Sequence, residues 1–306
     1  MKRRRFVSEG VNHVYQRTLN GFNIFYDVED YLVYYTIFSV VLRNYNIIAL
    51  GLCLMIDHIH MLLLTSQMSE MSLFLDHVTS IFVRESNRAV GRNGALFEPR
   101  FGSAPKVGAK KIRTSVSYLY NNPVERLLCN LAEDYRWNFL AYGKSSCPFS
   151  SKIDLARCSR SLRSSVKEIK VCHGKGLYLN FVQLRRIFAK VTDPLEREQL
   201  IDFIIWQYRF IDYDKLAGYY NSYDDMVMAI NANTGSEYDL NETFTFNTDA
   251  IYGSMVRCVR NMGYEHARQV TTAPESHKKK LLSEIRRQTM ASFAQIRKFL
   301  HMSSDT

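Results

Sequence analysis

The sequence predicts an α+β protein: a ferredoxin-like sandwich, with helices on one face of an antiparallel sheet, followed by a mostly helical C-terminal domain. The main observation is the order of patterns in the first half of the chain, which runs strand, helix, strand, strand, helix, strand, helix. The composition then shifts after Trp137, and beyond residue 165 nearly every apolar pattern has helical spacing. We therefore expect two domains, residues 1–145 and 146–306, as a chain of 306 residues favours.

Each element of the first half follows from its apolar pattern and its boundary residues. Asn20-Gly21 is a turn dipeptide that ends the first strand. Asp27 is placed as a helix cap, and Gly91 ends a long amphipathic helix. The expected strands are 11–19, 47–55, 58–65 and 97–104, and the expected helices are 28–44, 69–90 and 110–128, the last one broken by Pro123.

The second half is predicted to be helical. A segment rich in Ser and Cys at 145–165 is the expected linker. Asp193-Pro194 predicts a helix start, because Asp caps helices and proline favours the first helical position. Further helices are expected at 214–228, 250–261 and 274–290.

The end of the chain leaves two interpretations open. Residues 292–300 resemble the first helix of a helix-turn-helix, but the sequence ends at Thr306, where a recognition helix should follow. Either the sequence is truncated or the likeness is false. The C-terminal domain is thus a DNA-binding module or a helical bundle with a solvated basic face, whose charges are Lys278, Lys279, Lys280, Arg286 and Arg287.

The charge of the chain favours a polyanionic partner. It has 40 Lys and Arg residues against 30 Asp and Glu residues, a formal net charge of +10 and a sequence pI of about 9.2. Each Lys or Arg that neutralises a phosphate releases a condensed counterion, which drives nucleic-acid binding. Hydrophobic residues make up 46% of the chain, an ordinary globular composition, so a soluble basic protein without such a partner is the alternative.

The cysteines and apolar segments indicate a cytoplasmic protein with no membrane partner. The six cysteines include no Cys-x-x-Cys pair, which argues against a disulfide framework and a cysteine zinc site. The longest apolar run, residues 47–56, is shorter than the roughly 20 residues that a bilayer requires. Polar Ser8, Glu9 and Asn12 stand where a secretion signal has its apolar segment.

The sharpest chemical signal is a pair of histidines in the predicted strand 58–65. Residues two apart on a strand point to the same side, so His58 and His60 can aim at one ion while Ile59 and Met61 face the core. Taken alone, such a pair more often meets water or hydrogen-bond partners. Cys53 should point into the core, which argues against a zinc site made with the two histidines.

A second polar cluster gives the histidine pair a context. It comprises residues 118–124 (Tyr-Leu-Tyr-Asn-Asn-Pro-Val) and 134–137 (Asp-Tyr-Arg-Trp). With residues 55–64, it resembles the HUH single-tyrosine transposases, whose signatures are Met-x-Asn-His-x-His-Leu-Leu-Leu and Tyr-x-x-x-Asn-Pro-Val. Residues 10–142 are similar to the REP-associated tyrosine transposases. The other segments that fit in the family's order are 12–14, Arg17 and 97–101.

The resemblance implies a transposase-type DNA endonuclease and strand transferase. In that family, two histidines and one polar side chain hold Mg²⁺ or Mn²⁺, and they match His58, His60 and Asn122. The family's nucleophile matches Tyr118, which would attack single-stranded or hairpin DNA to give a 5′-phosphotyrosine link and a free 3′-hydroxyl. Two imidazole ligands tilt the site toward Mn²⁺. One departure is Asp57, which stands where the family usually has Asn.

Helical spacing favours Tyr118 over Tyr120 as the nucleophile. Asn122 lies four residues after Tyr118 and shares its face, whereas Tyr120 is turned by about 200°. Pro123 disfavours helical geometry at Asn122, so this relation requires the kink to fall after Asn122. Tyr120 is expected to pack in the core or to stack on a base, and two core tyrosines are the alternative.

Other residues and functions are less sharply defined. Four residues lie in segments that the resemblance places near DNA, namely His13, Arg17, Arg100 and Lys106, and each could equally be a solvated charge. Two other functions stay open: a non-catalytic binder of structured nucleic acid, and a phosphodiesterase that uses the histidine pair with water as nucleophile. The joint presence of the histidines, the tyrosine and the asparagine favours strand cutting. Whether the protein forms a homodimer stays open as well.

Overall fold

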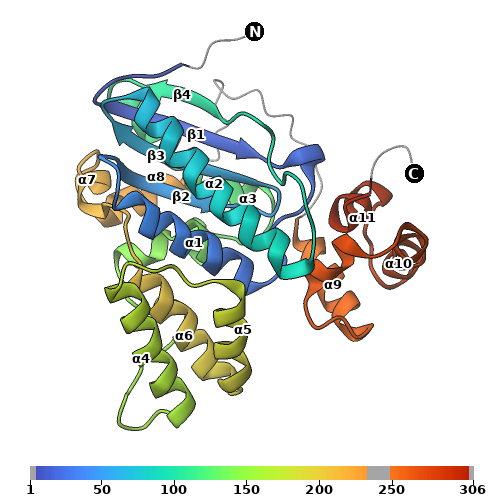
Figure 1. Cartoon of the computed structure of the whole chain (residues 1–306). Helices are drawn as coiled ribbons and strands as arrows, with labels where there is room; N and C mark the ends of the chain where they lie inside the picture. Colours follow the sequence, from blue (N-terminus) through green and yellow to red (C-terminus); the bar gives the residue numbers. More distant parts are fainter. Residues whose placement is uncertain (1–4, 233–248, 303–306) are drawn as a thin grey trace.

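A four-stranded antiparallel sheet forms the centre of the first half of the molecule (Figure 1). The computed structural model describes residues 5–232 and 249–302. The strands lie in the order β2-β3-β1-β4, and two helices connect β1 to β2 and β3 to β4, as predicted for a ferredoxin-like fold. The bounds are β1 (Gly10–Arg17), α1 (Val28–Leu42), β2 (Ile48–Leu54), β3 (His58–Thr65), α2 (Met68–Val90) and β4 (Gly102–Lys106).

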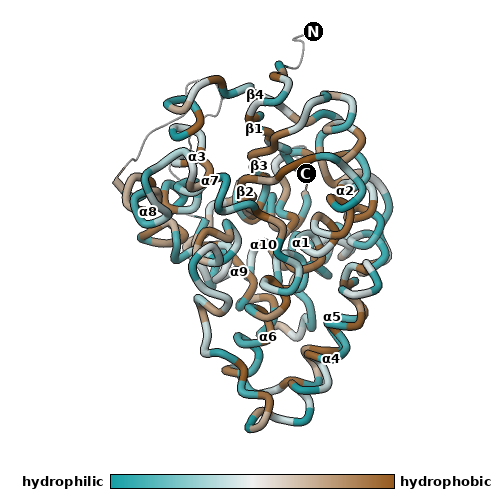
Figure 2. The backbone as a smooth tube through the Cα atoms, turned by 90° about the vertical axis from the view of Figure 1, so that its left-hand side faces the viewer, coloured by the Kyte–Doolittle hydropathy of each residue, from teal (hydrophilic) through white to brown (hydrophobic). Residues whose placement is uncertain are grey.

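Helices cover both faces of this sheet, whereas the sequence predicted helices on one face. α1 and α2 pack on one face, and α3 (Ala109–Glu125), which follows β4, packs on the other. Figure 2 shows the strands between these two layers. The residues of β2 and β3 are buried almost without exception, so neither face of these two strands is exposed to water.

The alternation along β3 sorts its side chains between the two layers. Ile59 and Met61 belong to the core under α1 and α2, as predicted. His58 and His60 point to the other face, where both contact Asn122 of α3. One face of β3 therefore packs in the core under α1 and α2, and the opposite face carries His58 and His60.

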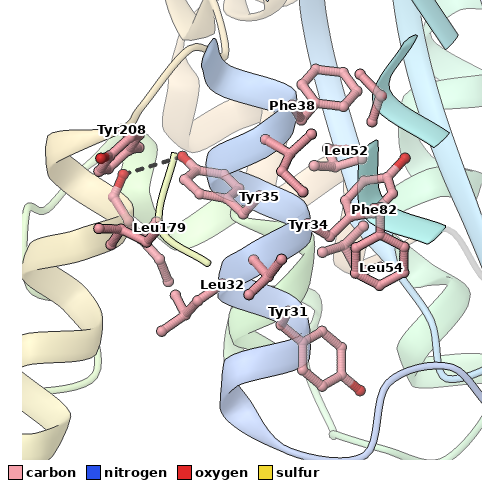
Figure 3. Packing of buried hydrophobic residues seen from close by; sticks show 14 of the residues in the cluster. Tyr31, Leu32, Tyr34, Tyr35, Phe38, Leu52, Leu54, Phe82, Leu179 and Tyr208 are labelled. Atoms are coloured by element: carbon pink, nitrogen blue, oxygen red, sulfur yellow. Dashed lines mark hydrogen bonds between the residues drawn. The ribbon is translucent and has the colours of Figure 1, made fainter. Parts of the chain in front are cut away.

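Nearly every residue of α1 is buried, and this helix ties the two halves of the chain together. Its outer side packs against α5 (Phe181–Lys190) and α6 (Pro194–Gln207), and α4 (Arg160–Gly174) packs on α6. The ring centroids of Tyr35 and Phe38 lie 5.0 and 4.6 Å from that of Phe210. The Tyr35 hydroxyl also donates to the Ile205 carbonyl at 3.2 Å (Figure 3). One continuous hydrophobic core thus crosses residue 145.

The remaining helices form two further groups. α7 (Tyr213–Ala217) and α8 (Tyr223–Asn231) share a core with α3. α9 (Ala250–Asn261), α10 (Glu275–Gln288) and α11 (Phe293–Leu300) form a smaller core that includes Tyr26 and Ile56. None of the helices in the described ranges is both long and apolar enough to cross a bilayer. Residues after 302 lie outside the described part, so the helix-turn-helix stays a prediction.

Two boundaries in the first half differ from the prediction. The strand expected at 97–104 is β4 at Gly102–Lys106, and Phe97 forms only an isolated bridge to Thr18. Pro123 does not break α3, which continues to Glu125. The proline cannot donate to the Leu119 carbonyl, and the helix ends two residues after it.

Two boundaries in the second half differ from the prediction because serine caps start helices inside the predicted segments. The helix expected at 214–228 is two helices, since α7 ends at Gly218 and Ser222 caps α8 by accepting from the Asp225 amide. The expected linker 145–165 is shorter, because Ser159 accepts from the Leu162 amide at 3.0 Å and starts α4. The predicted start of α6 is confirmed, with Asp193 as its cap.

The shared core yields a prediction about fragments. A fragment ending at residue 145 should not unfold cooperatively, because the outer side of α1 would lose Phe210 and its neighbours. A fragment ending at residue 232 keeps α5, α6 and Phe210 on the outer side of α1 and should unfold cooperatively. Thermal unfolding followed by circular dichroism compares them, and a sharp transition in the shorter fragment would contradict this account of the core.

A second prediction concerns the buried ion pair between Asp30 and Arg268, whose side chains are 3% and 5% exposed and lie 2.7 Å apart. Arg268→Met leaves the Asp30 charge buried and unpaired, so the free energy of unfolding should fall by about 3–5 kcal/mol. Arg260→Met is the control. It removes a pair to Asp27 whose arginine side chain is 49% exposed, and it should cost about 0–1 kcal/mol. Equal losses in urea titrations would show that Arg268 does not stabilise the docking of the C-terminal helices.

Candidate active site

The polar residues of the candidate site come from three elements that meet on the α3 face of the sheet. β3 supplies His58 and His60, β1 supplies His13, and α3 supplies Tyr118 and Asn122. All five residues are at most 6% exposed. Buried polar groups need hydrogen-bond partners, so these contacts determine how each ring is oriented.

Both histidines of β3 turn the same ring nitrogen toward Asn122. The Nε2 atom of His58 lies 3.2 Å from Asn122 Oδ1, and the Nε2 atom of His60 lies 3.3 Å from Asn122 Nδ2. The two imidazole rings are nearly perpendicular, with centroids 4.9 Å apart. The structure therefore brings together the three predicted metal ligands.

The other nitrogen of each ring is held by an outer partner. Asp57 Oδ1 lies 2.6 Å from His58 Nδ1, and His13 Nε2 lies 3.1 Å from His60 Nδ1. Partners of this kind fix ring orientation and tautomer in proteins that bind metals through histidine. Since the Asn122 amide donates to His60 Nε2, the proton of a neutral His60 lies on Nδ1 and is donated to His13.

The electrostatics of the site keep Asp57 ionised and His60 neutral. Burial alone would raise the pKa of Asp57, but the hydrogen bond and charge of His58, with Lys298 and Arg126, hold this pKa below its ordinary value. Burial, followed by the charges of neighbouring histidines and arginines, lowers the pKa of His60 well below its ordinary value. A neutral imidazole is the form that binds a metal.

The donor set fits a divalent cation. Within the described ranges no three His, Cys, Asp or Glu side chains are grouped so that they could hold a metal ion alone, so a site here depends on the Asn122 amide oxygen. Ligand atoms about 2.1 Å from an ion at right angles lie roughly 3.0 Å apart. The separation of 3.2 Å between His58 Nε2 and Asn122 Oδ1 is close to that value. Two imidazoles and one amide oxygen suit Mn²⁺ better than the all-oxygen sites that Mg²⁺ prefers.

Tyr118 and Tyr120 lie on opposite sides of α3, as their spacing predicts. The Tyr118 ring centroid lies 5.5 Å from that of His60 and 5.6 Å from that of His13. Tyr120 is buried among hydrophobic side chains between α3 and β2, and burial raises its pKa well above the ordinary value. Asn122 is helical despite Pro123, so Tyr118 and Asn122 share the face that meets the histidines.

The four residues predicted to lie near DNA have different surroundings. His13 is buried in the site as a partner of His60, and Lys106 on β4 is also buried, at 2% exposed. Arg17 and Arg100 are exposed, as a phosphate contact requires. The backbone segments that carry these two arginines lie side by side, because the amide of Glu98, two residues before Arg100, donates to the Arg17 carbonyl at 3.0 Å. A DNA contact by these two arginines stays a prediction.

Sequence reasoning missed several neighbours of the site. Tyr15 pairs with His60 in the sheet and packs against Tyr118; the alternation of His13 and Tyr15 along β1 was a signal for this. Lys298 Nζ on α11 lies 4.0 Å from Asp57 Oδ2. Burial, with the charge of Asp57, raises the pKa of Asp249 to about 6. No local pattern links Lys298 or Asp249 to the histidines.

Comparisons with known proteins give little beyond this geometry. No protein-family model matches the chain, and no curated protein sequence matches it. Among solved structures, the chain is similar to a REP-associated tyrosine transposase bound to a REP hairpin, with 17% sequence identity and a TM-score of 0.40. That similarity covers 47% of this chain and 86% of the other chain. A likeness this weak says nothing further about the chemistry, which rests on this chain's own side chains.

Proposed function

We propose that this protein cuts single-stranded or hairpin-forming DNA and transfers the strand through a tyrosine intermediate. The observation that supports this most strongly is the convergence of His58 and His60 on Asn122, one helical turn from a tyrosine that contacts His60. His58, His60 and Asn122 would hold Mn²⁺ or Mg²⁺. When bound, such an ion neutralises charge on the scissile phosphate and polarises it toward attack.

The residues of the chain account for the remaining steps. The phenolic oxygen of Tyr118 forms a bond to phosphorus, and the bond from phosphorus to the 3′-oxygen breaks. The products are a 5′-phosphotyrosine and a 3′-hydroxyl, which carries the proton that the phenol loses. Because a phosphodiester is exchanged for another phosphodiester, the strand can be rejoined by the reverse reaction without a nucleotide cofactor.

Access to Tyr118 requires a local rearrangement. Tyr118 is 1% exposed, so its hydroxyl cannot meet a phosphate until a neighbouring side chain moves. Tyr15 packs against Tyr118 and is only half-buried, which makes it the side chain we expect to move. The exposed Arg17 follows Tyr15 by two residues on the same face of β1, where it can bind the phosphate that enters.

A non-catalytic nucleic-acid binder explains these observations less well. A binder needs exposed cations and aromatic rings, whereas the histidines and Asn122 are buried and hydrogen-bonded to one another, and Tyr118 is buried against His60. Burying polar groups costs free energy unless each is paired. Such a cluster is expected where chemistry is carried out.

The nucleophile gives the sharpest prediction. Tyr118→Phe removes the attacking oxygen and little else, so it should abolish covalent capture of a labelled DNA hairpin in Mn²⁺ while hairpin binding stays within about twofold of wild type. Tyr120→Phe is the matched control and should still form the adduct. Denaturing electrophoresis detects the adduct, and mass spectrometry locates it. Capture by Tyr118→Phe, or a nucleotide on Tyr120, would overturn the proposal.

The metal site predicts changes that can be measured without DNA. Binding of Mn²⁺ to the protein alone, followed by electron paramagnetic resonance, should be lost in His60→Ala. Asp57→Asn keeps the shape of the side chain but removes the negative charge that holds the His58 ring, so the Mn²⁺ affinity should fall about 10- to 100-fold. Asp76→Asn removes an exposed carboxylate from α2 and should change nothing. Unchanged affinity in His60→Ala would exclude the histidine pair as ligands.

A further inference from the structure

A cavity of about 230 Å³ lies between α4, α6 and the irregular segment 144–159. Phe203 and Trp206 of α6 give it aromatic walls. Among the described residues that line it, the charged ones are Lys152 and Lys170, and none is acidic. α4 and α6 form the end of the molecule farthest from β4 in Figures 1 and 2, so this cavity is separate from the histidine site.

A buried carboxylate holds the irregular wall of this cavity in place. Asp202 on α6 is fully buried and accepts hydrogen bonds from the Phe149 amide at 3.0 Å, the Ser150 hydroxyl at 2.8 Å and the Tyr142 hydroxyl at 2.6 Å. Gln199 donates to the Ser151 hydroxyl at 2.8 Å. Burying a carboxylate is costly, and here it fixes a segment without regular structure. The cavity is therefore formed before any ligand binds.

The size and lining of the cavity select a flat aromatic ring with an anion beside it. Pockets for whole small molecules have roughly 300–1,000 Å³, so this smaller cavity suits one ring of a larger ligand. Phe203 and Trp206 offer surfaces for stacking, and the two lysines offer positive charge for an anionic group. Lys170 Nζ lies 5.9 Å from the Phe203 ring centroid, which places this charge beside an aromatic wall. Arg209 does not line the cavity, but its guanidinium carbon lies 4.3 Å from the Trp206 ring centroid.

We infer that this cavity binds one unstacked base of a single-stranded DNA, with a neighbouring phosphate at Lys152 and Lys170. The inference rests on the proposed function, which supplies the polymer. Stacking on aromatic side chains together with charge contacts to phosphate is how proteins hold single strands without reading their sequence. The cavity thus holds the strand at a distance from the site of cleavage.

The two tryptophans of the chain make this inference testable in the full-length protein. Trp206 lines the cavity, whereas Trp137 stacks on Tyr31 with ring centroids 4.3 Å apart. Titration with a thymidine decamer should quench tryptophan fluorescence, and an abasic decamer should not. The quenching should disappear in Trp206→Phe, which leaves Trp137 as the remaining tryptophan. Decamer binding measured by fluorescence anisotropy should weaken about 5- to 150-fold in Trp206→Ala.

Charge variants on α4 test the phosphate contact. Lys170→Gln should reduce the slope of log affinity against log salt concentration by about one, because one phosphate contact is lost. Lys167→Gln is the matched control; Lys167 is exposed on the same helix but does not line the cavity. Leu155→Glu, at an exposed position of the lining, should weaken binding without removing a core side chain.

The outcomes separate this inference from the proposed function. Equal quenching by the abasic decamer, tighter binding of a uridine RNA decamer, or equal salt slopes in the two lysine variants would overturn the cavity as a site for a DNA base. If the decamer does not quench Trp206 but the protein still forms the covalent adduct, base binding in the cavity is rejected and strand cleavage is kept. Quenching of Trp206 without any adduct would reject strand cleavage and keep the cavity.

Discussion

The burial of α1 on nearly every side is the constraint on which the rest of the structure depends. A helix that is apolar all round needs partners on both its inner and its outer side. The sheet covers the inner side, and Phe210 with its neighbours around α5 and α6 covers the outer side. The second half of the chain is therefore needed to complete the core of the first. The sheet in turn keeps its other face for α3, and that face carries the histidines.

Burying polar side chains at that second face is possible because each is paired with another. His13, His60 and Asn122 form a chain of hydrogen bonds that reaches His58 and then Asp57. In a site of low dielectric constant such a chain is rigid when complete and costly when broken. The arrangement turns the Nε2 atoms of both histidines of β3 toward the Asn122 side chain.

Much of this could be predicted from sequence because the relevant spacings are local. The period of two along β3 placed His58 and His60 on one side, and the period of 3.6 along α3 separated Tyr118 from Tyr120. Contacts between segments that are far apart in the chain could not be predicted from the sequence. The burial of His13, the covering of the sheet by α3, and the approach of Lys298 to Asp57 depend on tertiary packing, which no local period encodes.

The contact between α11 and the turn that carries Asp57 has a thermodynamic consequence. Lys298 lies 4.0 Å from Asp57, and Asp57 orients His58. If an ion binds more tightly when α11 is docked, then docking must be favoured by the same factor when the ion is bound. Under that condition the C-terminal helices and the histidine pair would be linked reciprocally, through the contact of Lys298 with Asp57 and without a covalent change.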